Sequence, residues 1–568
     1  MFVNTPIRRI LFIFINLFLI LFIKYYIFSP VFYAKVLIFP YAITPFDLCS
    51  KNPELWFYLK FVYIVISFIA PFIYLNSIYN LIFNKKKSII PYLEYSKYNK
   101  NKLSLYVGNT NKNVPIIIPE SSLYQNILIT GTIGTGKTSC AIYPFTKQLI
   151  KYNSNDFEQK LGMLILDVKG NYYKKVTEYA KKFGREDDLI VIELNGNFKY
   201  NPLDKPNLKP SILANRLKTI LTLFSQNNGE SYWLDKAEQV LTECIKICRL
   251  YNNGYVTFSE LHKLITIPNY FSNKLFILKN NFLNGDYSHS DVHDILSAID
   301  FFEKEFNSLD SRTLSILKSE ITRITGCFIS DYDVLDIFSP SKNSQNFYGF
   351  KDVVENGKIV VLNMNIAEYR NLSKIIAAYL KLDFQTEVMA RLANKSADTI
   401  RSVAFISDEY HEYVTDTDAN FFAQSREAKC VNIVATQSYT SLLSAINNQH
   451  IVKVIIQNLI NKLWFRTDDI FTVEEAQKQI GKEEKSRFSQ TFSENSNKTD
   501  FNYLTNSFNS HNSNLSESIN SYTQYDYVFD TNFFTQKLET FSCLAFLSTG
   551  SKIIPPMKLN LVPYFKQD

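Results

Sequence analysis

Two hydrophobic patterns alternate along most of this chain. Short runs of consecutive apolar residues, bounded by polar residues or glycine, predict strands that are buried on both faces of a sheet. These runs lie at residues 114–118, 126–130, 164–166, 189–193, 358–364, 402–407, 431–435, 541–547 and 558–562. Between several of them, apolar residues recur with helical spacing, as at 172–183 and 372–392. This alternation predicts an α/β domain built on a parallel sheet.

The alternation stops between residues 207 and 330. The periodic segments here all have helical spacing, and none reads as a strand; they lie at residues 211–224, 232–251, 293–306 and 312–324. We therefore expect an inserted all-α domain at 207–330 that divides the α/β domain into residues 85–206 and 331–568. Within the second part, residues 483–530 are rich in Asn, Ser and Thr, which is typical of a flexible loop or a partly disordered insertion.

The first 84 residues have a third pattern. Residues 10–23 carry no charge, and apolar residues continue to 28 beyond Lys24, whose long side chain can reach the headgroups. Residues 61–84 form a second uncharged stretch that is long enough to cross a bilayer. Two transmembrane helices are therefore expected, with 1–84 as a membrane anchor. A cleaved signal peptide is the alternative for the first stretch, but no Ala-x-Ala-like site follows it.

Positive charge sets the expected orientation of the two spans. Arginines at 8–9 precede the first span and lysines at 85–87 follow the second. The positive-inside rule then places both ends of the chain in the cytoplasm and leaves only about residues 29–54 outside.

A glycine-rich stretch follows the second predicted strand and opens a helix. It fills the pattern GxxxxGK[ST] with Gly131, Thr132, Ile133, Gly134, Thr135, Gly136, Lys137 and Thr138, and Ser139 begins the helix. Glycines let backbone N–H groups surround a phosphate, and the helix start adds unpaired N–H groups and a positive dipole end. Lys137 is expected to reach the β- and γ-phosphates, and the Thr138 hydroxyl to coordinate Mg²⁺. The stretch predicts binding of ATP with Mg²⁺.

Acidic residues follow two of the predicted strands. Asp408 and Glu409 come directly after the strand at 402–407, where Asp408 would hold Mg²⁺ through water and Glu409 would polarise the attacking water. Asp167, after the strand at 164–166, is the alternative magnesium carboxylate, although no second acid follows it.

Two further residues are candidates for the hydrolytic step. Gln437 follows the strand at 431–435 and could sense the γ-phosphate or orient water; an ordinary strand-end glutamine is the alternative. Arg426 lies eleven residues earlier and could complete the site of a neighbouring subunit as an arginine finger. A surface arginine without such a role is the other interpretation.

The net charge and the cysteine content add little to what the motifs indicate about partners, metal sites and disulfides. The formal net charge of +7 permits nucleic acid or anionic lipid as a partner and establishes neither. Seven scattered cysteines give neither a metal quartet nor a disulfide framework.

The order of these features resembles the type IV secretion coupling proteins, the TraG/TraD-like ATPases of bacterial conjugation. Two N-terminal spans, a phosphate loop, a helical insertion, Asp-Glu and then Ala-Thr-Gln-Ser occur in that family's order. Shorter similarities are found at Asp167, Lys169 and Gly170, at Asn201, Pro202 and Leu203, at Tyr232, Trp233 and Ala237, and at residues 461–469.

This resemblance implies a membrane-anchored, RecA-like P-loop ATPase that assembles as a homo-hexamer at the bacterial inner membrane. Such a motor joins a single- or double-stranded DNA substrate, with its relaxase-type protein, to the type IV secretion channel and uses ATP hydrolysis to power transfer. The short extracytoplasmic loop and the segment 483–530 depart from the family pattern and leave the substrate and the channel partner open.

Two other functions are compatible with the sequence. An FtsK-like DNA translocase shares the motor, but more spans, a long linker and a C-terminal winged-helix domain are expected there. A docking receptor that recruits protein effectors, with ATP used for assembly, is the second alternative. DNA stimulation of ATP hydrolysis distinguishes a DNA motor from such a receptor.

Overall fold

The computed structural model forms two compact units, Met1–Tyr92 and Leu93–Asp568. It describes residues 102–566, with gaps at 168, 224–230, 268, 285–286, 395–399, 447, 496–499, 503–506 and 510–513, and only scattered residues before 102. In the first unit, β1 (Val36–Ile38) and β2 (Tyr41–Ile43) form an antiparallel pair. The two predicted membrane spans lie almost entirely outside the described residues. Within the described residues, no helix has the length and apolar character needed to cross a bilayer.

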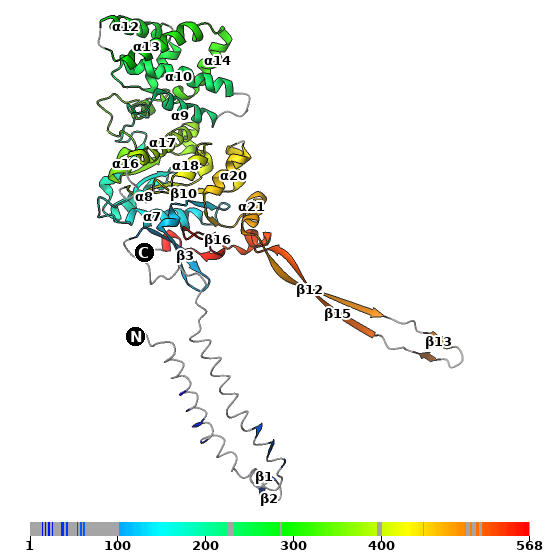
Figure 1. Ribbon diagram of the computed structural model, residues 1–568. Helices are drawn as coiled ribbons and strands as arrows, with labels where there is room; N and C mark the ends of the chain where they lie inside the picture. Colours follow the sequence, from blue (N-terminus) through cyan, green and yellow to red (C-terminus); the bar gives the residue numbers. More distant parts are fainter. Residues whose placement is uncertain are drawn as a thin grey trace. The chain divides into compact units, whose positions relative to one another are not determined.

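An eleven-stranded sheet forms the centre of the second unit (Figure 1). Seven neighbouring strands are parallel, which confirms the predicted α/β fold. In spatial order they are β11 (Asn461–Trp464), β5 (Ile127–Thr130), β10 (Cys430–Thr436), β9 (Val403–Ser407), β6 (Gly162–Leu166), β8 (Ile359–Asn363) and β7 (Leu189–Glu193). Every residue of β5, β6, β9 and β10 is buried, as their unbroken apolar or small sequences require.

Four antiparallel strands extend the sheet beyond β11. They are β16 (Ser542–Phe546), β17 (Met557–Asn560), β3 (Ser104–Thr110) and β4 (Pro115–Pro119), in that order. The sequence predicted three of them and missed β3, in which polar and apolar residues alternate.

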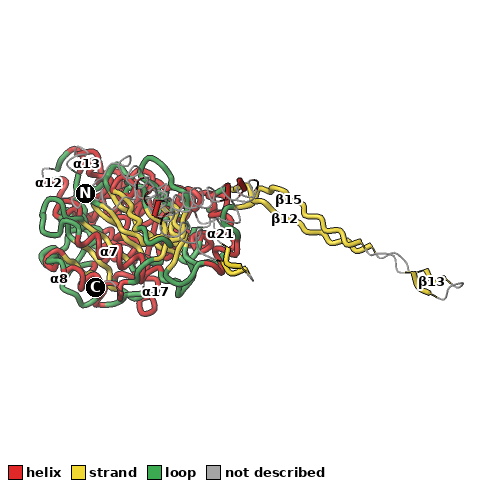
Figure 2. The backbone as a smooth tube through the Cα atoms, turned by 90° about the horizontal axis from the view of Figure 1, so that it is seen from below, coloured by secondary structure: helices red, strands yellow, loops and turns green. Residues whose placement is uncertain are grey.

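Helices fill the connections between the parallel strands, as Figure 2 shows from below. The phosphate-loop stretch continues into a wide helical turn at Lys137–Ile142 and then α7 (Tyr143–Lys151), while α8 (Tyr172–Lys182) joins β6 to β7. The long α17 (Ile366–Asn394) joins β8 to β9 and contacts β6 and α9.

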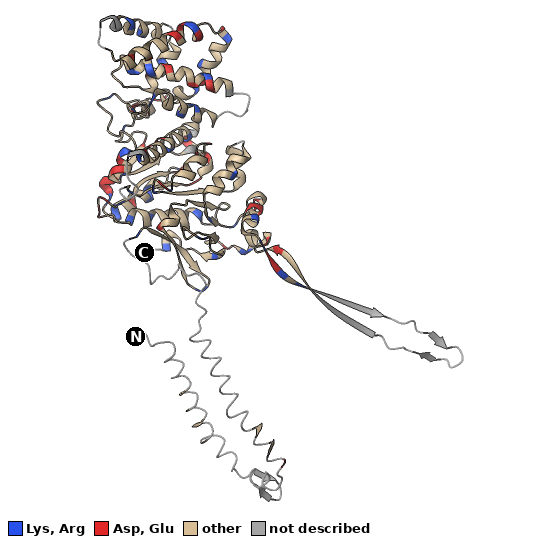
Figure 3. Ribbon diagram, in the orientation of Figure 1, with Lys and Arg blue, Asp and Glu red and all other residues tan. Residues whose placement is uncertain are grey.

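In the stretch predicted as an all-α insertion, the regular elements among the described residues are all helices. Between β7 and β8 the chain forms α9 (Pro210–Thr222), α10 (Ser231–Tyr251), α11 (Phe258–Thr266), α12 (Tyr270–Asn284), α13 (His289–Asp300), α14 (Ser311–Thr325), α15 (Tyr332–Phe338) and α16 (Lys351–Asn356). Figure 1 shows α10 and α12–α14 grouped beyond α17, away from the sheet, and Figure 3 shows that these helices carry both basic and acidic residues. One hydrophobic core nevertheless runs from the sheet into these helices.

The Asn/Ser/Thr-rich segment differs from the flexible loop expected from its composition. Its described residues form an antiparallel ribbon of β12 (Lys482–Asn495) and β15 (Asn514–Tyr527), with β13 (Asp500–Asn502) and β14 (Ser507–Asn509) as a second pair. The average composition concealed strand-forming residues such as Phe492, Ile519 and Tyr527, which are spread among the polar ones.

Candidate functional site

The predicted site residues meet where four parallel strands end. Thr130 of β5 pairs with Thr436 of β10, and Ser407 of β9 pairs with Leu166 of β6. Because parallel strands share one carboxyl edge, the segments after them come together in the crevice where α/β sheets bind ligands. Backbone hydrogen bonds join neighbouring segments: Gly131 N donates to Gln437 O at 3.2 Å, and Asp408 N donates to Leu166 O at 3.1 Å.

The loop from Gly131 to Gly136 has the backbone conformation of a phosphate cradle. Gly134 and Gly136 have φ of +79° and +102°, values that side-chain-bearing residues rarely adopt. A Cβ on Gly134 would meet nothing within 4 Å, so the loop is open to an incoming ligand there. Ile133 is 78% exposed, and Ser139 lies in the first helical turn, where its hydroxyl donates to Gly136 O at 3.3 Å.

Thr132 and Thr135 stabilise the loop rather than point out of it. The Thr135 hydroxyl donates to Thr132 O at 2.8 Å, and the Thr132 hydroxyl donates to Arg466 O at 3.1 Å. The Thr132 backbone N–H also donates to Arg466 O, at 2.9 Å, so the backbone N–H groups suited to an anion are those from Ile133 onward.

The Lys137 ammonium lies over the loop and is buried. It donates to Gly131 O and, at 3.2 Å, to Thr132 O. Burial lowers the pKa of Lys137, although Glu409 and Asp408 oppose that shift. The ammonium therefore lies against the first two residues of the glycine-rich loop, and its contact with phosphates stays a prediction.

Thr138 and Asp408, the two residues predicted to hold magnesium, are in direct contact. The Thr138 hydroxyl donates to Asp408 Oδ2 at 2.8 Å. Burial raises the pKa of Asp408 to about 6, while Lys169 opposes the shift. A hydroxyl and a carboxylate beside the phosphate loop are oxygen donors of the kind that Mg²⁺ prefers, so these residues fit the ion.

Glu409 has strained backbone geometry beside this pair. Its φ and ψ are +49° and +47°, a conformation uncommon for a residue other than glycine. Strain of this kind accumulates at functional sites. Its side chain is 9% exposed, and Oε2 is buried without a hydrogen-bond partner. A buried, unpartnered carboxylate oxygen can accept a proton from a bound water.

Asp167, the alternative magnesium ligand, has a different task. Its carboxylate accepts backbone N–H groups from Lys169 at 3.0 Å and from Tyr172 at 3.3 Å. It thereby organises the start of α8, whose first N–H groups need acceptors. The geometry consequently favours Asp408 over Asp167 as the magnesium carboxylate.

Gln437 and Arg426 lie at opposite ends of β10. Gln437 follows the strand at the phosphate-loop edge and is half-buried. Arg426 is exposed in the loop that precedes β10, at the other edge of the sheet. Within one chain Arg426 is therefore remote from the phosphate loop, and a role for it would require a second subunit.

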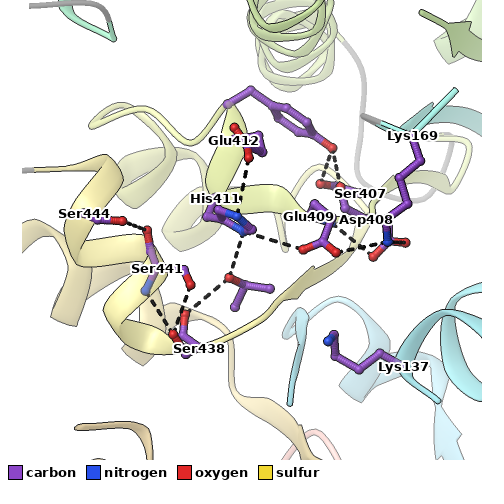
Figure 4. Close-up of polar contacts among 12 residues, drawn as sticks. Lys137, Lys169, Ser407, Asp408, Glu409, His411, Glu412, Ser438, Ser441 and Ser444 are labelled. Atoms are coloured by element: carbon purple, nitrogen blue, oxygen red, sulfur yellow. Dashed lines mark hydrogen bonds and ion pairs between the residues drawn. The ribbon is translucent and has the colours of Figure 1, made fainter. Parts of the chain in front are cut away.

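Sequence reasoning did not assign a role to two groups that contact the acids (Figure 4). Lys169 Nζ lies 3.1 Å from Glu409 Oε1 and 3.9 Å from Asp408 Oδ2. His411 Nδ1 lies 3.8 Å from Glu409 Oε2 and 3.2 Å from the Thr436 hydroxyl. Burial lowers the pKa of His411, while Glu409 and Glu412 oppose the shift. The Asp-x-Lys-Gly similarity at 167–170 was the one signal in the sequence that could have found Lys169.

Comparisons with known proteins identify the fold. No protein-family model matches the sequence, and no curated protein matches it. Among solved structures, the plasmid coupling protein TrwB with a GTP analogue is similar at TM-score 0.53 and 14% identity, covering 80% of this chain and 89% of that one. TrwB with ADP and Mg²⁺ gives TM-score 0.52 and 12% identity over 81% and 91%, and TrwB with an ATP analogue gives 0.52 and 13% over 80% and 89%. The chain has the fold of the bacterial conjugative coupling protein TrwB.

Proposed function

We propose that this chain is a P-loop ATPase of the type IV secretion coupling class, which uses ATP hydrolysis to transfer DNA or a DNA–protein substrate. The observation that carries the proposal is the hydrogen bond from Thr138 to Asp408 at 2.8 Å, with Glu409 next to it. It joins the phosphate loop to the acids across 270 residues, and it does so at the strand ends where nucleotides bind.

Each residue has a defined part in hydrolysis. The backbone N–H groups of 133–136 and the start of the following helix hold the phosphates, and Lys137 stabilises the charge that develops on the γ-phosphate. Glu409 accepts the proton of the attacking water through its unpartnered oxygen. Mg²⁺ held by Thr138 and Asp408 would neutralise phosphate charge. Gln437 orients the water from the neighbouring strand end.

The proposed coupling role is supported by the similarity of fold to TrwB, which is a bacterial conjugative coupling protein. The apolar stretches at 10–28 and 61–84 support an inner-membrane anchor. A homo-hexamer would bring Arg426 of one subunit to the nucleotide of the next, which a single chain does not achieve.

Steady-state ATP hydrolysis by the full-length chain tests the proposal, with Lys137→Ala as the control for contaminating ATPases. We expect Mg²⁺-dependent turnover that single- or double-stranded DNA increases several-fold and that Lys137→Ala lacks. Equal turnover by Lys137→Ala would refute the site. Turnover that DNA leaves unchanged would refute the DNA motor and favour a receptor for protein effectors.

A further inference from the structure

Local contacts hold the backbone of Lys169 and of the residue after it. Its backbone N–H donates to Asp167 Oδ1 at 3.0 Å, and the other oxygen of that carboxylate accepts from Tyr172 N at 3.3 Å. The next residue, Gly170, has φ of +68°, and a Cβ there would lie 3.0 Å from Asn365. Any larger residue at 170 would therefore push this loop away from Asn365. The fold thus fixes the backbone from which Lys169 extends.

The Lys169 side chain crosses from the end of β6 to the acids after β9. Its ammonium lies 3.1 Å from Glu409 Oε1 and 3.9 Å from Asp408 Oδ2. The lysine side chain is 50% exposed, whereas the two carboxylates are 9% and 3% exposed. One end of the ion pair is therefore fixed and buried, and the other end is a long chain that water can reach.

Two ammonium groups lie in the electrostatic field of these two carboxylates. Asp408 and Glu409 favour the charged form of both Lys137 and Lys169, and, together with burial, the charge of Lys169 lowers the pKa of Lys137. Figure 4 shows the two lysines on either side of the acids. A phosphate held by the loop beside Lys137 would thus lie near a second cation from the same chain.

We propose that Lys169 is a second cation for the terminal phosphate of ATP, supplied by the same chain as the phosphate loop. This inference rests on the proposed ATPase function. Without nucleotide, Lys169 pairs with Glu409. With ATP bound, the ammonium turns to the γ-phosphate, and this frees Glu409 Oε1.

The Lys169 ammonium can move from Glu409 to the γ-phosphate without a large rearrangement. Because the Lys169 side chain is half-exposed, water competes for its ammonium and weakens its hold on Glu409. The flexible four-carbon stem lets the ammonium change partners without a backbone movement. In the step itself, Glu409 takes a proton from water, the water oxygen bonds to the γ-phosphorus, and the bond to the bridging oxygen breaks with its electron pair leaving on ADP. Lys169 keeps its proton and stabilises charge on the transferred group.

Lys169→Met and Lys169→Arg in the full-length chain test the proposal, with Lys181→Met as the matched control. Lys181 is an exposed lysine in the last turn of α8 and lies outside the site. We expect Lys169→Met to lower kcat about 100-fold and to weaken binding of a non-hydrolysable ATP analogue. ADP lacks the γ-phosphate, so its affinity should change less than twofold. Lys169→Arg, which keeps the charge, should retain most of the turnover, and Lys181→Met should match the wild type.

Two results would overturn the assignment. Turnover by Lys169→Met within threefold of wild type would mean that the ammonium does not meet the reacting phosphate. An equal loss of affinity for ADP and for the ATP analogue would make Lys169 a structural counter-ion of the acids. Either result leaves the ATPase proposal standing as long as wild type hydrolyses ATP and Lys137→Ala does not.

Discussion

Asp418 lies at the centre of a buried polar network behind the acidic segment, and we expect Asp418→Ala to destabilise the protein. Its carboxylate is fully buried and accepts four hydrogen bonds. The donors are the Lys381 ammonium at 2.5 Å, Gln385 Nε2 at 2.8 Å, Thr415 N at 3.0 Å and the Tyr410 hydroxyl. Lys381 and Gln385 belong to α17, so Asp418 attaches the segment after Glu409 to that helix.

The expected loss of stability follows from the buried Lys381 ammonium, which Asp418→Ala leaves without its carboxylate. Lys381 is also fully buried, and its remaining hydrogen-bond partners are uncharged: Tyr413 O at 2.8 Å and the Thr415 hydroxyl at 2.9 Å. Breaking a buried ion pair by removing one partner costs about 3–5 kcal/mol, because the other charge is left uncompensated. We expect Asp418→Ala to lower the free energy of unfolding by that amount. ATP hydrolysis should also fall, since the Tyr413 hydroxyl in this segment donates to Asp408 O at 2.8 Å.

Urea unfolding of the full-length chain, with ATP turnover measured in parallel, is the assay. Glu427→Ala, which removes an exposed acid in the loop before β10, is the control and should change stability by less than about 0.5 kcal/mol. Lys381→Met combined with Asp418→Ala should recover much of the loss, because replacing both charges of a buried pair is often nearly neutral. Two results would show that the Lys381–Asp418 pair does not have this role. The first is a loss below about 1 kcal/mol in the free energy of unfolding for Asp418→Ala. The second is a double variant whose loss equals the sum of the losses in the two single variants.

Three further predictions concern separate residues. Lys137→Ala should abolish ATP turnover and leave the melting temperature nearly unchanged, because its ammonium bonds only to carbonyls of its own loop; near-normal turnover in a folded variant would contradict this. Lys462→Met should raise the free energy of unfolding at pH 7, because burial lowers the pKa of Lys462 to about 7. The gain should reach at most roughly 5 kcal/mol. It should shrink as the pH rises from 7 towards 10.5, where the lysine of the unfolded chain also loses its proton. A gain in urea unfolding that does not depend on pH would argue against that origin. Arg426→Ala should bind ATP normally but lose hydrolysis in the assembly, and mixing it with Lys137→Ala subunits should restore some activity; a mixture that co-assembles and stays inactive would exclude the action of Arg426 on a neighbour.

The local part of the fold was predictable because buried parallel strands carry a strong signal. The apolar runs that end at Thr130, Leu166 and Ser407 are strands whose every residue is buried, and the turn chemistry after each run identified the residues now found at one edge. Thr138 and Asp408 could be paired in advance because each belongs to a motif with a known partner.

The remainder depends on contacts between distant residues. Lys169 and Glu409 are separated by 240 positions, and nothing near Lys169 in the sequence identifies its partner. In the sequence, Asp383 and Lys381 are polar positions in a helical pattern, and nothing near them shows that they are buried. In the structure, Asp383 pairs with Lys205 and Arg216, and Lys381 pairs with Asp418. In the same way, composition alone assigned 483–530 to a loop, because pairing of β12 with β15 is a property of the two strands together.

The proposal that the acids after β9 activate water for ATP hydrolysis is tested most directly by Glu409→Gln measured beside wild type. The amide preserves the shape of the side chain but cannot take a proton from water, and loss of a general base slows a reaction about 10²–10⁴-fold. In single-turnover experiments with the full-length chain and Mg-ATP, the variant should bind ATP with wild-type affinity and form ADP at least about 100-fold more slowly. ADP formation by Glu409→Gln at the wild-type rate would show that the acids after β9 do not activate water, and the proposed active site would be wrong.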